Sequence, residues 1–389
     1  MILVSFHNLQ WERLKFDCKH EEETSLKERL LYTASCPFEA ARNVSMLPEG
    51  HRAKNMHGHS FRARVRAELP VGWARFSGEE TSILTSALAA VVATLDYQLL
   101  NNHVSTPTDE NLAKWLQAKL DIPGIESLGI QSTGNQGADI DGRGHAHVWR
   151  RFRFESAHQL PNVPKGHQCG RMHGHGFEVI LHADQDLNDK DMGVDYDKLG
   201  EIWAPLQAEL NLSCLNDIPG LENPTSEMLA TWLWRRIKPV LTELSWITVY
   251  ETVTAGCHFD GSHYRIWKEF RFESACRLVR APEGDARRKL HGHSYLCRLH
   301  LTSPLDEVLG WTVDYGDVKE VFKPVYKELD HYFLNDLPGM IDGDVATILH
   351  WIKKNLAHHL PQLDRIDLNE TPNSGAILSW GEQPPALPT

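Results

Sequence analysis

The stretch FESAHQLPNVPKGHQCGRMHGH, residues 154–175, carries the pattern that decides the fold. Its closing His-Gly-His also occurs at 57–59 and at 291–293, at separations of 116 residues (57 to 173) and 118 residues (173 to 291). Its opening Phe-Glu-Ser-Ala returns at 272–275, and as Phe-Glu-Ala-Ala at 38–41. A period of this length is that of a whole domain, not of a solenoid unit. The sequence therefore predicts three homologous domains in tandem, at 31–132, 148–256 and 266–381.

The middle copy indicates the secondary structure expected of all three. Residues 148–160 and 173–182 have the pattern of two antiparallel strands, and 246–252 that of a closing strand. Helical spacing runs over 195–209, and a second helix begins near 223–225 and continues toward Ile237. This order predicts an α+β domain with helices on one face of an antiparallel sheet. Gly- and Asp-rich segments between the copies are expected to be linkers, at 132–144 and 255–262.

Composition excludes several classes of protein. Hydrophobic content of 41% and charged content of 24% are ordinary for a globular protein, and no apolar run approaches the ~18–20 residues that span a bilayer. The formal net charge of −12 argues against a broad nucleic-acid surface. Seven cysteines form no C-x-x-C pair, and the first residues lack the features of a secretory signal. We therefore expect a cytoplasmic protein without a membrane or nucleic-acid partner.

Three histidines of the middle copy are candidate metal ligands. His173 and His175 are two residues apart on an expected strand, so both side chains point to one face. His158 ends the preceding expected strand and can converge on the same point. Three histidines with an open fourth position form the ligand set of a catalytic zinc ion, a Lewis acid for a substrate oxygen. We expect Zn²⁺ here, although a lone His-x-His pair is more often a surface or core feature.

Cys169 lies in the loop before His173 and is a candidate nucleophile or general base. Thiolates form most readily beside cations or a metal ion. Lys165 and Arg171 flank this cysteine, so the sequence predicts a lowered pKa for its thiol. The alternative is a buried, inert thiol.

At these residues the sequence resembles the 6-pyruvoyltetrahydropterin synthase superfamily of the tunnelling fold, and within it the 6-carboxytetrahydropterin synthases of queuosine and 7-deazaguanine biosynthesis. The shared text is the stretch quoted above, LNDIPGLENPTSE at 215–227 and YETVTAGC at 250–257. This text covers nearly all of residues 150–258. The first and third copies resemble the same family more weakly, along their whole length.

The resemblance implies a role for individual residues of the middle copy. Zinc ligands match His158, His173 and His175, and the catalytic cysteine matches Cys169. Glu251 matches the glutamate that anchors the amino-pyrimidine edge of a pterin. A carboxylate suits that role because it accepts two parallel hydrogen bonds from a guanidine-like edge. Glu370 of the third copy is a second possible anchor.

The family also uses an Asp-His pair together with the cysteine, and in this feature the copies differ. The middle copy reads Asn211-Leu212 at the matching position, whereas the third copy reads Asp330-His331. Asn does not ionise and Leu carries no proton. The resemblance therefore implies a composite site, in which Asp330 and His331 complete the zinc and thiol set of the middle copy.

The other two copies have lost ligands. In the third copy Cys276 replaces the first histidine and Arg287 replaces the cysteine. His291 and His293 remain, so the binding of a second zinc ion by Cys276, His291 and His293 stays an open alternative. The first copy has lost the same two groups and the anchoring glutamate, to Arg42, Ala53 and Gln131. Tunnelling-fold subunits close into ring barrels, so the resemblance implies a pseudo-trimeric barrel built from one chain. It further implies a homodimer of such rings.

The activity that the resemblance implies is that of a carbon–carbon lyase. The reaction converts 7,8-dihydroneopterin triphosphate to 6-carboxy-5,6,7,8-tetrahydropterin, acetaldehyde and triphosphate. Two alternatives stay open. One is 6-pyruvoyltetrahydropterin formation, which uses the same metal and cysteine without cleaving the side chain. The other is a non-catalytic pterin-binding or assembly protein, since two of the three copies have lost catalytic residues.

Overall fold

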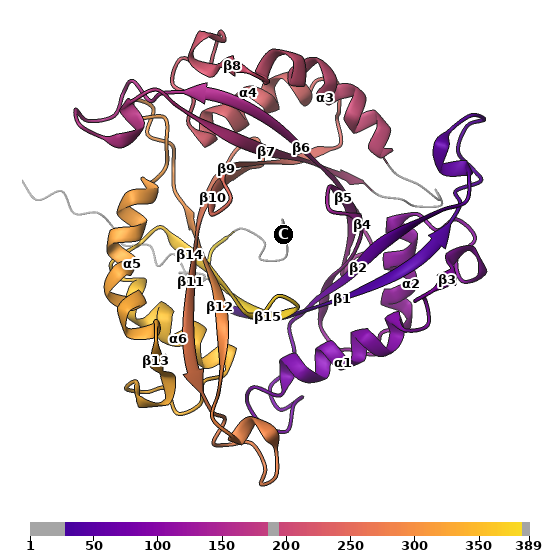
Figure 1. Cartoon of the computed structure of the whole chain (residues 1–389), viewed down its shortest axis with the longest axis vertical. Helices are drawn as coiled ribbons and strands as arrows, with labels where there is room; N and C mark the ends of the chain where they lie inside the picture. The colour runs from indigo at the N-terminus through magenta and orange to yellow at the C-terminus, as the bar shows by residue number, and fades with distance from the viewer. Residues whose placement is uncertain (1–27, 186–193, 383–389) are drawn as a thin grey trace, which may run out of the picture.

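The three copies fold as three similar sectors around one axis, in a computed structural model that describes residues 28–185 and 194–382 (Figure 1). Each sector has two long strands, two helices and two further strands. The first copy contains β1 (Arg29–Arg42), β2 (His57–Ala67), α1 (Glu80–Val92), β3 (Gln98–Leu99), α2 (Asp109–Lys119), β4 (Ile125–Thr133) and β5 (Gln136–Asp141). Two short 3₁₀ turns, η1 (Arg52–Lys54) and η2 (Leu100–Asn102), belong to it as well.

The second and third copies repeat this order. The second contains β6 (Ala146–His158), η3 (Gln168–Gly170), β7 (His173–Gln185), α3 (Tyr196–Leu210), β8 (Ser213–Cys214), η4 (Leu215–Asp217), α4 (Ser226–Ile237), β9 (Leu244–Thr252) and β10 (Ala255–Phe259). The third contains β11 (Tyr264–Cys276), η5 (Ala286–Arg288), β12 (His291–Thr302), α5 (Tyr315–Leu329), β13 (Tyr332–Phe333), η6 (Leu334–Asp336), α6 (Val345–Leu356), β14 (Leu363–Thr371) and β15 (Ser374–Ser379).

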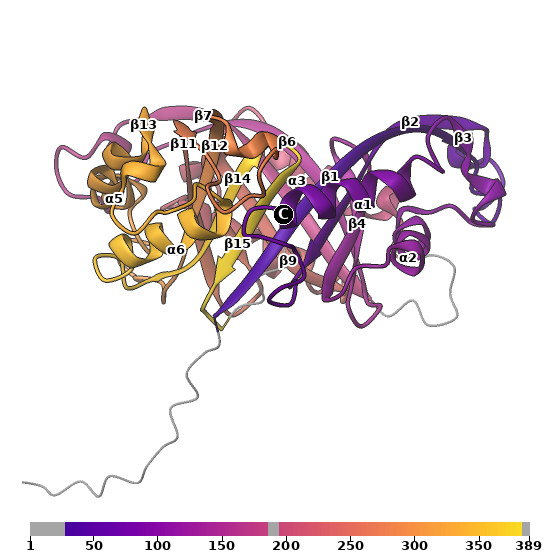
Figure 2. The ribbon, with the colours of Figure 1, turned by 90° about the horizontal axis from the view of Figure 1, so that it is seen from below.

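The long strands form one closed antiparallel barrel, seen from the side in Figure 2. Neighbouring copies join through three antiparallel pairs: β5 with β6, β10 with β11, and β15 with β1. The last pair sets Arg29 opposite Ser379 and closes the ring. A closed wall removes the exposed strand edges that an open sheet would have. The α+β fold predicted from the sequence, with three tunnelling-fold copies in a pseudo-trimeric barrel, is confirmed.

The segments expected to be linkers turn out to be strands, and that expectation was wrong. Residues 136–141 form β5 and residues 255–259 form β10, the strands through which the copies join. Their glycines serve close packing rather than flexibility. A Cβ atom on Gly137 would lie 2.7 Å from the Trp149 ring, and one on Gly256 would lie 2.4 Å from a Trp267 ring atom. Glycine inside a strand often marks such an approach.

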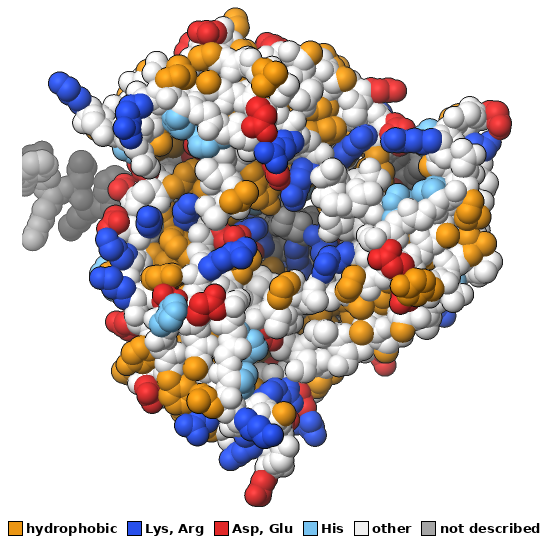
Figure 3. Space-filling view, in the orientation of Figure 1, with side chains coloured by type: hydrophobic (Ala, Val, Ile, Leu, Met, Phe, Trp, Pro, Cys, Tyr) orange, Lys and Arg blue, Asp and Glu red, His pale blue; other side chains and the backbone are white. Residues whose placement is uncertain are grey.

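The two faces of the barrel wall have different chemistry. On β2, Phe61, Ala63 and Val65 pack into the hydrophobic core beneath the helices. Side chains alternate along a strand, so Arg64 and Arg66 belong to the opposite face. Because the helices lie outside the ring in Figure 1, that face is the inside of the barrel. Figure 3 shows Lys and Arg side chains gathered around the middle of the ring.

The helices begin where the sequence provides capping groups. Asp195 accepts a hydrogen bond from the Asp197 N–H before α3, and Thr225 accepts one from the Met228 N–H before α4. The expected helix starts near 195 and 225 therefore agree with the structure. Among the described residues, no helix combines the length and the apolar character needed to cross a membrane.

Candidate metal centre

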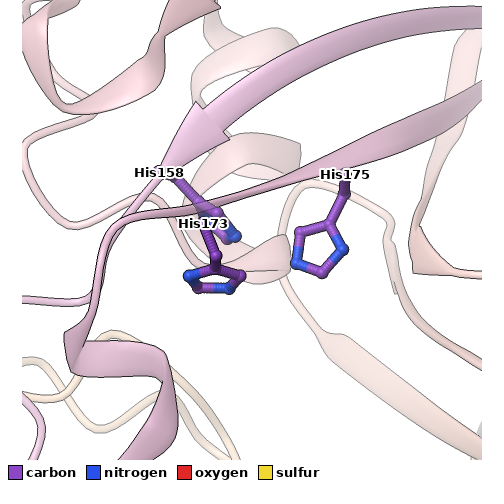
Figure 4. A group of neighbouring side chains, drawn as sticks. All are labelled: His158, His173 and His175. Atoms are coloured by element: carbon purple, nitrogen blue, oxygen red, sulfur yellow. The ribbon is translucent and has the colours of Figure 1, made fainter.

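Three histidine rings of the second copy surround one point at the end of the β6–β7 pair (Figure 4). His158, the last residue of β6, lies opposite His173, the first residue of β7, and His175 follows on the same face of β7. Ring centroids of His158 and His173 are 4.5 Å apart, and those of His173 and His175 are 4.9 Å apart. Ligand nitrogens from all three lie within 4.8 Å of one another. The structure thus brings together the three histidines singled out from the sequence.

Hydrogen bonds orient two of the rings. His158 Nδ1 lies 3.0 Å from the Pro224 carbonyl oxygen, and His173 Nδ1 lies 2.7 Å from that of Arg171. A carbonyl only accepts, so each Nδ1 carries the proton and each Nε2 keeps its lone pair. The Nε2 atoms of His158 and His175 are buried and lack a hydrogen-bond partner among the described residues. Buried nitrogens of this kind need a partner, and a zinc ion with three imidazole ligands provides one.

Burial keeps these imidazoles in the form that binds metal. Desolvation lowers the pKa of His158 to about 4, against the opposing effect of its hydrogen bond to Pro224. The pKa of His175 is lowered as well, chiefly by desolvation and then by the charge of His173. Neutral imidazole is the ligating species, so no proton has to leave these two rings when a metal ion binds.

Cys169 lies on η3, in the loop that leads into His173, and is half-buried. Its backbone N–H donates to Nδ1 of His167 at 3.2 Å. This bond holds the turn that carries the thiol. The sequence expectation of a loop cysteine beside the histidines agrees with this position.

The environment of the Cys169 thiol differs from the sequence expectation. Burial raises the pKa of this thiol, and the nearby carboxylates of Glu251 and Asp314 raise it further. The sequence predicted that Lys165 and Arg171 lower the pKa of this thiol, and that expectation was wrong. Desolvation and two acidic neighbours set the direction of the shift.

Glu251, on β9, faces the histidines from the neighbouring strand. Its Oε1 atom lies 4.0 Å from Nε2 of His175. Desolvation raises the pKa of Glu251 to about 7, with a further increase from Glu227 and an opposing effect of Lys268. Glu227 is itself buried and accepts hydrogen bonds from the Thr312 N–H at 2.8 Å and hydroxyl at 3.1 Å. Its two acceptor bonds tie the second copy to the third.

These groups share a cavity of about 560 Å³ between the second and third copies. The second copy contributes Cys169, His173, His175 and Glu251 to its lining. The third copy contributes Lys268 and the segment before and at the start of α5, namely Trp311, Val313, Asp314, Tyr315 and Gly316. The site therefore lies at a junction of two copies, as the resemblance to ring-forming proteins implied.

Asp330 and His331 lie elsewhere on the third copy. Asp330 follows the C-terminal end of α5 and accepts a hydrogen bond from the Glu273 N–H at 3.0 Å. His331 Nδ1 lies 3.0 Å from Asp330 Oδ2, and its side chain is 78% exposed. The fifteen residues of α5 span about 21 Å from the cavity to this pair. Within one chain, the structure does not bring Asp330 and His331 into the cavity that holds Cys169.

Glu370 lies on β14 of the third copy, where it accepts a hydrogen bond from the Ser374 hydroxyl at 3.3 Å. It neighbours His293, whose pKa is lowered mainly by desolvation, and it is absent from the lining of the cavity with Cys169. Of the two glutamates expected to anchor a pterin, only Glu251 shares a cavity with the thiol.

Sequence reasoning missed several residues of this cavity. His167 Nε2 lies 3.0 Å from Asp314 Oδ2, which joins the thiol loop to α5. Tyr315 donates to or accepts from the Ser226 hydroxyl at 3.0 Å. The signal was present in the repeat: Val-Asp-Tyr occurs at 194–196 and again at 313–315, at the start of the equivalent helices.

The chain is similar to known proteins along most of its described length. The sequence model of the 6-pyruvoyl tetrahydropterin synthase family matches the chain three times, at 32–131, 147–262 and 265–380. A 6-carboxy-5,6,7,8-tetrahydropterin synthase of Synechocystis sp. is 32% identical over 119 residues, which are 29% of this chain and 91% of that protein. A dihydroneopterin monophosphate aldolase of Pyrococcus furiosus is 30% identical over 95 residues, which are 24% of this chain and 80% of that protein.

Among solved structures, the 6-pyruvoyl tetrahydropterin synthase of Caenorhabditis elegans is similar to part of the chain. It matches 30% of this chain and 96% of its own, with 20% identity and a TM-score of 0.29. The three family matches together account for most of the described residues. With three repeats in one closed barrel, this chain belongs to the 6-pyruvoyl tetrahydropterin synthase family.

Proposed function

We propose that the chain is a zinc-dependent carbon–carbon lyase that converts 7,8-dihydroneopterin triphosphate to 6-carboxy-5,6,7,8-tetrahydropterin, acetaldehyde and triphosphate. The observation that carries this proposal is one cavity lined by a thiol, a buried carboxylate and two histidines, His173 and His175, which cluster with His158 behind them. The similarity to the Synechocystis synthase supports the same reaction. Its product would serve queuosine or 7-deazaguanine biosynthesis.

Glu251 binds the amino-pyrimidine edge of the substrate in this proposal. That edge presents two parallel N–H groups, and a carboxylate accepts both. The raised pKa of Glu251, about 7, reflects burial without a cationic partner in contact. Donor groups of a bound pterin favour the ionised form and so strengthen the contact. Arg171 and Lys268 line the same cavity and offer positive charge to the triphosphate.

His158, His173 and His175 would hold the zinc ion, which when bound supplies Lewis-acid chemistry that makes the side-chain hydroxyls of the substrate more acidic. Cys169 lines the cavity beside His173 and moves protons to and from the substrate side chain. Its thiol has to lose a proton before it acts as a base. Because the pKa of this thiol is raised, positive charge in the metal-bound site is needed to favour the thiolate.

We propose further that Asp330 and His331 act in the cavity of a second copy of the chain. The barrel end that holds the cavity also carries exposed apolar side chains: Met172 beside His173, and Leu212 at the position that matches His331. The side chain of Leu212 is 83% exposed. Large apolar groups at one end favour association. A homodimer of pseudo-trimers stacked through this end would bring the Asp-His pair of one ring toward the other ring.

A complementation experiment tests the arrangement across two chains. Cys169→Ser and His331→Ala variants are each expected to lose turnover. Co-expressed under two different tags and purified as the mixed dimer, they are expected to regain activity, because one of the two sites then has both Cys169 and His331. Full activity of His331→Ala alone contradicts the role of the pair, and a mixed dimer without activity contradicts its delivery from the partner.

Product identification tests the reaction itself. Purified protein incubated with 7,8-dihydroneopterin triphosphate is expected to release acetaldehyde and 6-carboxy-tetrahydropterin. A product that keeps the full side chain indicates 6-pyruvoyltetrahydropterin formation instead. Cleavage of the monophosphate in preference to the triphosphate favours the aldolase reaction named for the Pyrococcus relative. Cys36→Ser is a matched control for Cys169→Ser, because Cys36 is a free, half-buried thiol of the first copy.

A further inference from the structure

The position of the three-histidine cluster exists once in each copy, because the strand register repeats. His158 lies opposite His173, Cys276 lies opposite His291, and Arg42 lies opposite His57. The three copies have therefore placed a histidine, a cysteine and an arginine at the same point of the fold. What each side chain does at that point differs.

In the first copy, the side chain supplies a positive charge of its own. Arg42 is buried, and its guanidinium donates to Asp109 Oδ1 at 2.7 Å and to the Pro107 carbonyl at 2.8 Å. A fixed cation at this point leaves no role for a metal ion. The first copy thus lacks the ligand set, and the guanidinium of Arg42 occupies the position of the first ligand.

In the third copy, three side chains that can bind a metal ion meet instead. Cys276 Sγ and nitrogens of His291 and His293 lie within 4.8 Å of one another. Cys276 is 1% exposed, so its sulfur is held away from bulk water. The loop arginine at the position of Cys169 is engaged elsewhere: Arg287 donates to Asp285 at 2.9 Å and to the Ser82 hydroxyl at 3.1 Å.

The distance between two of these ligands is that of a tetrahedral metal site. Cys276 Sγ and His291 Nε2 are 3.6 Å apart. Bonds of about 2.3 Å to sulfur and about 2.0–2.1 Å to nitrogen, at a tetrahedral angle, separate the two ligand atoms by about 3.6 Å. A thiol donating to an imidazole would give a similar separation, so the experiment has to distinguish the two.

Surrounding residues orient these ligands as they do in the second copy. His291 Nδ1 lies 2.7 Å from the Lys289 carbonyl oxygen, which turns Nε2 toward Cys276. The Tyr295 hydroxyl lies 3.8 Å from Cys276 Sγ. A Cβ atom on Gly343 would lie only 2.3 Å from Cys276 Cβ, so glycine at 343 lets the backbone pass close to the cysteine side chain. Hydrogen-bond partners that orient the ligand side chains commonly accompany metal ligands.

We propose that the third copy binds a second divalent metal ion of the zinc class through the Cys276 thiolate, His291 and His293. Binding releases the thiol proton to solvent, because the thiolate is the ligand. Arg287 stands where Cys169 stands in the second copy and joins the third copy to the first through Ser82. The second ion therefore has no thiol beside it at the position of Cys169, and all three of its ligands come from the third copy.

Cobalt(II) is the probe that tests this proposal on the full-length chain. Metal-free protein titrated with Co²⁺ is expected to bind two ions, with a near-ultraviolet thiolate-to-cobalt charge-transfer band that follows only one of them. Cys276→Ser is expected to lose one ion and the band, whereas His173→Ala loses the other ion and keeps the band. Cys169→Ser, which removes the other thiol near a histidine cluster, should leave the band unchanged.

Cys276→His keeps the result decisive if the serine variant fails to fold. This variant repeats the ligand set of the second copy and is expected to bind two cobalt ions with no thiolate band. A wild-type protein that binds one ion without the band overturns the proposal, as does a band lost in Cys169→Ser. These outcomes are independent of turnover, so they do not depend on the reaction proposed for the second copy.

Discussion

His167 of the second copy and Asp314 of the third meet across the junction of the two copies, with Nε2 and Oδ2 3.0 Å apart. Nδ1 of the same ring accepts a hydrogen bond from the Cys169 N–H, so Nε2 carries the proton and donates it to Asp314. A similar contact occurs one junction earlier, where His51 Nε2 lies 3.1 Å from Asp197 Oδ2 and 3.8 Å from Asp195, the counterpart of Asp314. His167 therefore holds the thiol loop against the start of α5 in one defined tautomer.

Replacing His167 by alanine is expected to lower kcat about 10- to 100-fold, since a loosened reactive group costs rate through positioning. KM and zinc content should change little, because His167 contributes neither a zinc ligand nor the pterin anchor. Steady-state kinetics and metal analysis on the same sample measure this split. His51→Ala makes the same change at the junction of the first and second copies. An equal loss of kcat in that control would mean that the effect is structural.

Removing His173 is expected to abolish metal binding at the second copy and, with it, turnover. Two imidazoles remain after this change, so the proposed zinc site loses a third of its protein ligands. His57→Ala is the matched control, because His57 begins β2 as His173 begins β7, with its Nδ1 held 2.8 Å from the Asn55 carbonyl. Turnover that persists in His173→Ala would exclude a role for this metal ion in the reaction.

Glu251→Gln is expected to raise KM about 10- to 100-fold, because hydrogen bonds to a charged group contribute ~1.5–3 kcal/mol. The amide keeps the shape of the side chain but donates where a carboxylate accepts. Glu370→Gln serves as the control, since Glu370 lies outside the cavity that holds Cys169. Equilibrium binding of an unreactive pterin, measured by fluorescence quenching, separates affinity from rate. Similar binding by wild type and Glu251→Gln would contradict the anchoring role.

We expect the His147–Asp184 pair of β6 and β7 to make the free energy of unfolding depend on pH. Nδ1 of His147 lies 2.6 Å from Asp184 Oδ1. Burial opposes the charge on His147, but the hydrogen bond and charge of Asp184 raise its pKa above 6.5. Burial likewise opposes ionisation of Asp184, and the hydrogen bond and charge of His147 lower its pKa below 3.8. The pair is therefore fully charged in the folded state over a wider pH range than in the unfolded chain.

Each partner contributes in its own pH range. The raised pKa of His147 gives stability that is complete below about 6.5 and disappears as pH rises through the folded value. The lowered pKa of Asp184 gives stability above about 3.9 that is lost as pH falls through the folded value. We expect His147→Asn to destabilise the chain by ~1 kcal/mol at pH 5.5, because Asp184 is partly exposed, and by less at pH 9. Urea unfolding at both pH values measures the difference; an equal loss at both would exclude the charged pair.

The repeat and the histidine cluster could be predicted from the sequence because both depend on short-range pattern. Two histidines at positions 173 and 175 of a strand share a face by geometry alone, and the structure agrees. The strands β5 and β10 could not be read in the same way. Gly137 and Gly256 are typical of loops, and only the tryptophans that pack against them explain their place inside a sheet.

The third copy's part in the cavity also depended on tertiary structure. From the sequence, Asp330 and His331 were the expected contribution, because they restore a motif that the second copy lacks. The helix α5 instead presents its opposite end, with Asp314 and Tyr315, to the cavity. A sequence gives the order of the two helix ends, but the direction in which the helix lies across the junction is fixed by packing.

The pairing of β1 with β15 has a consequence for how the chain can be opened. Arg29 lies opposite Ser379, so the first and last strands are neighbours in the wall and a short peptide can join them. Any of the three junctions is then a suitable place for new termini, and circular permutants should fold to the same ring. A permutant opened between β5 and β6 would begin with the second copy and follow it directly with the third, keeping both walls of the cavity in unbroken chain.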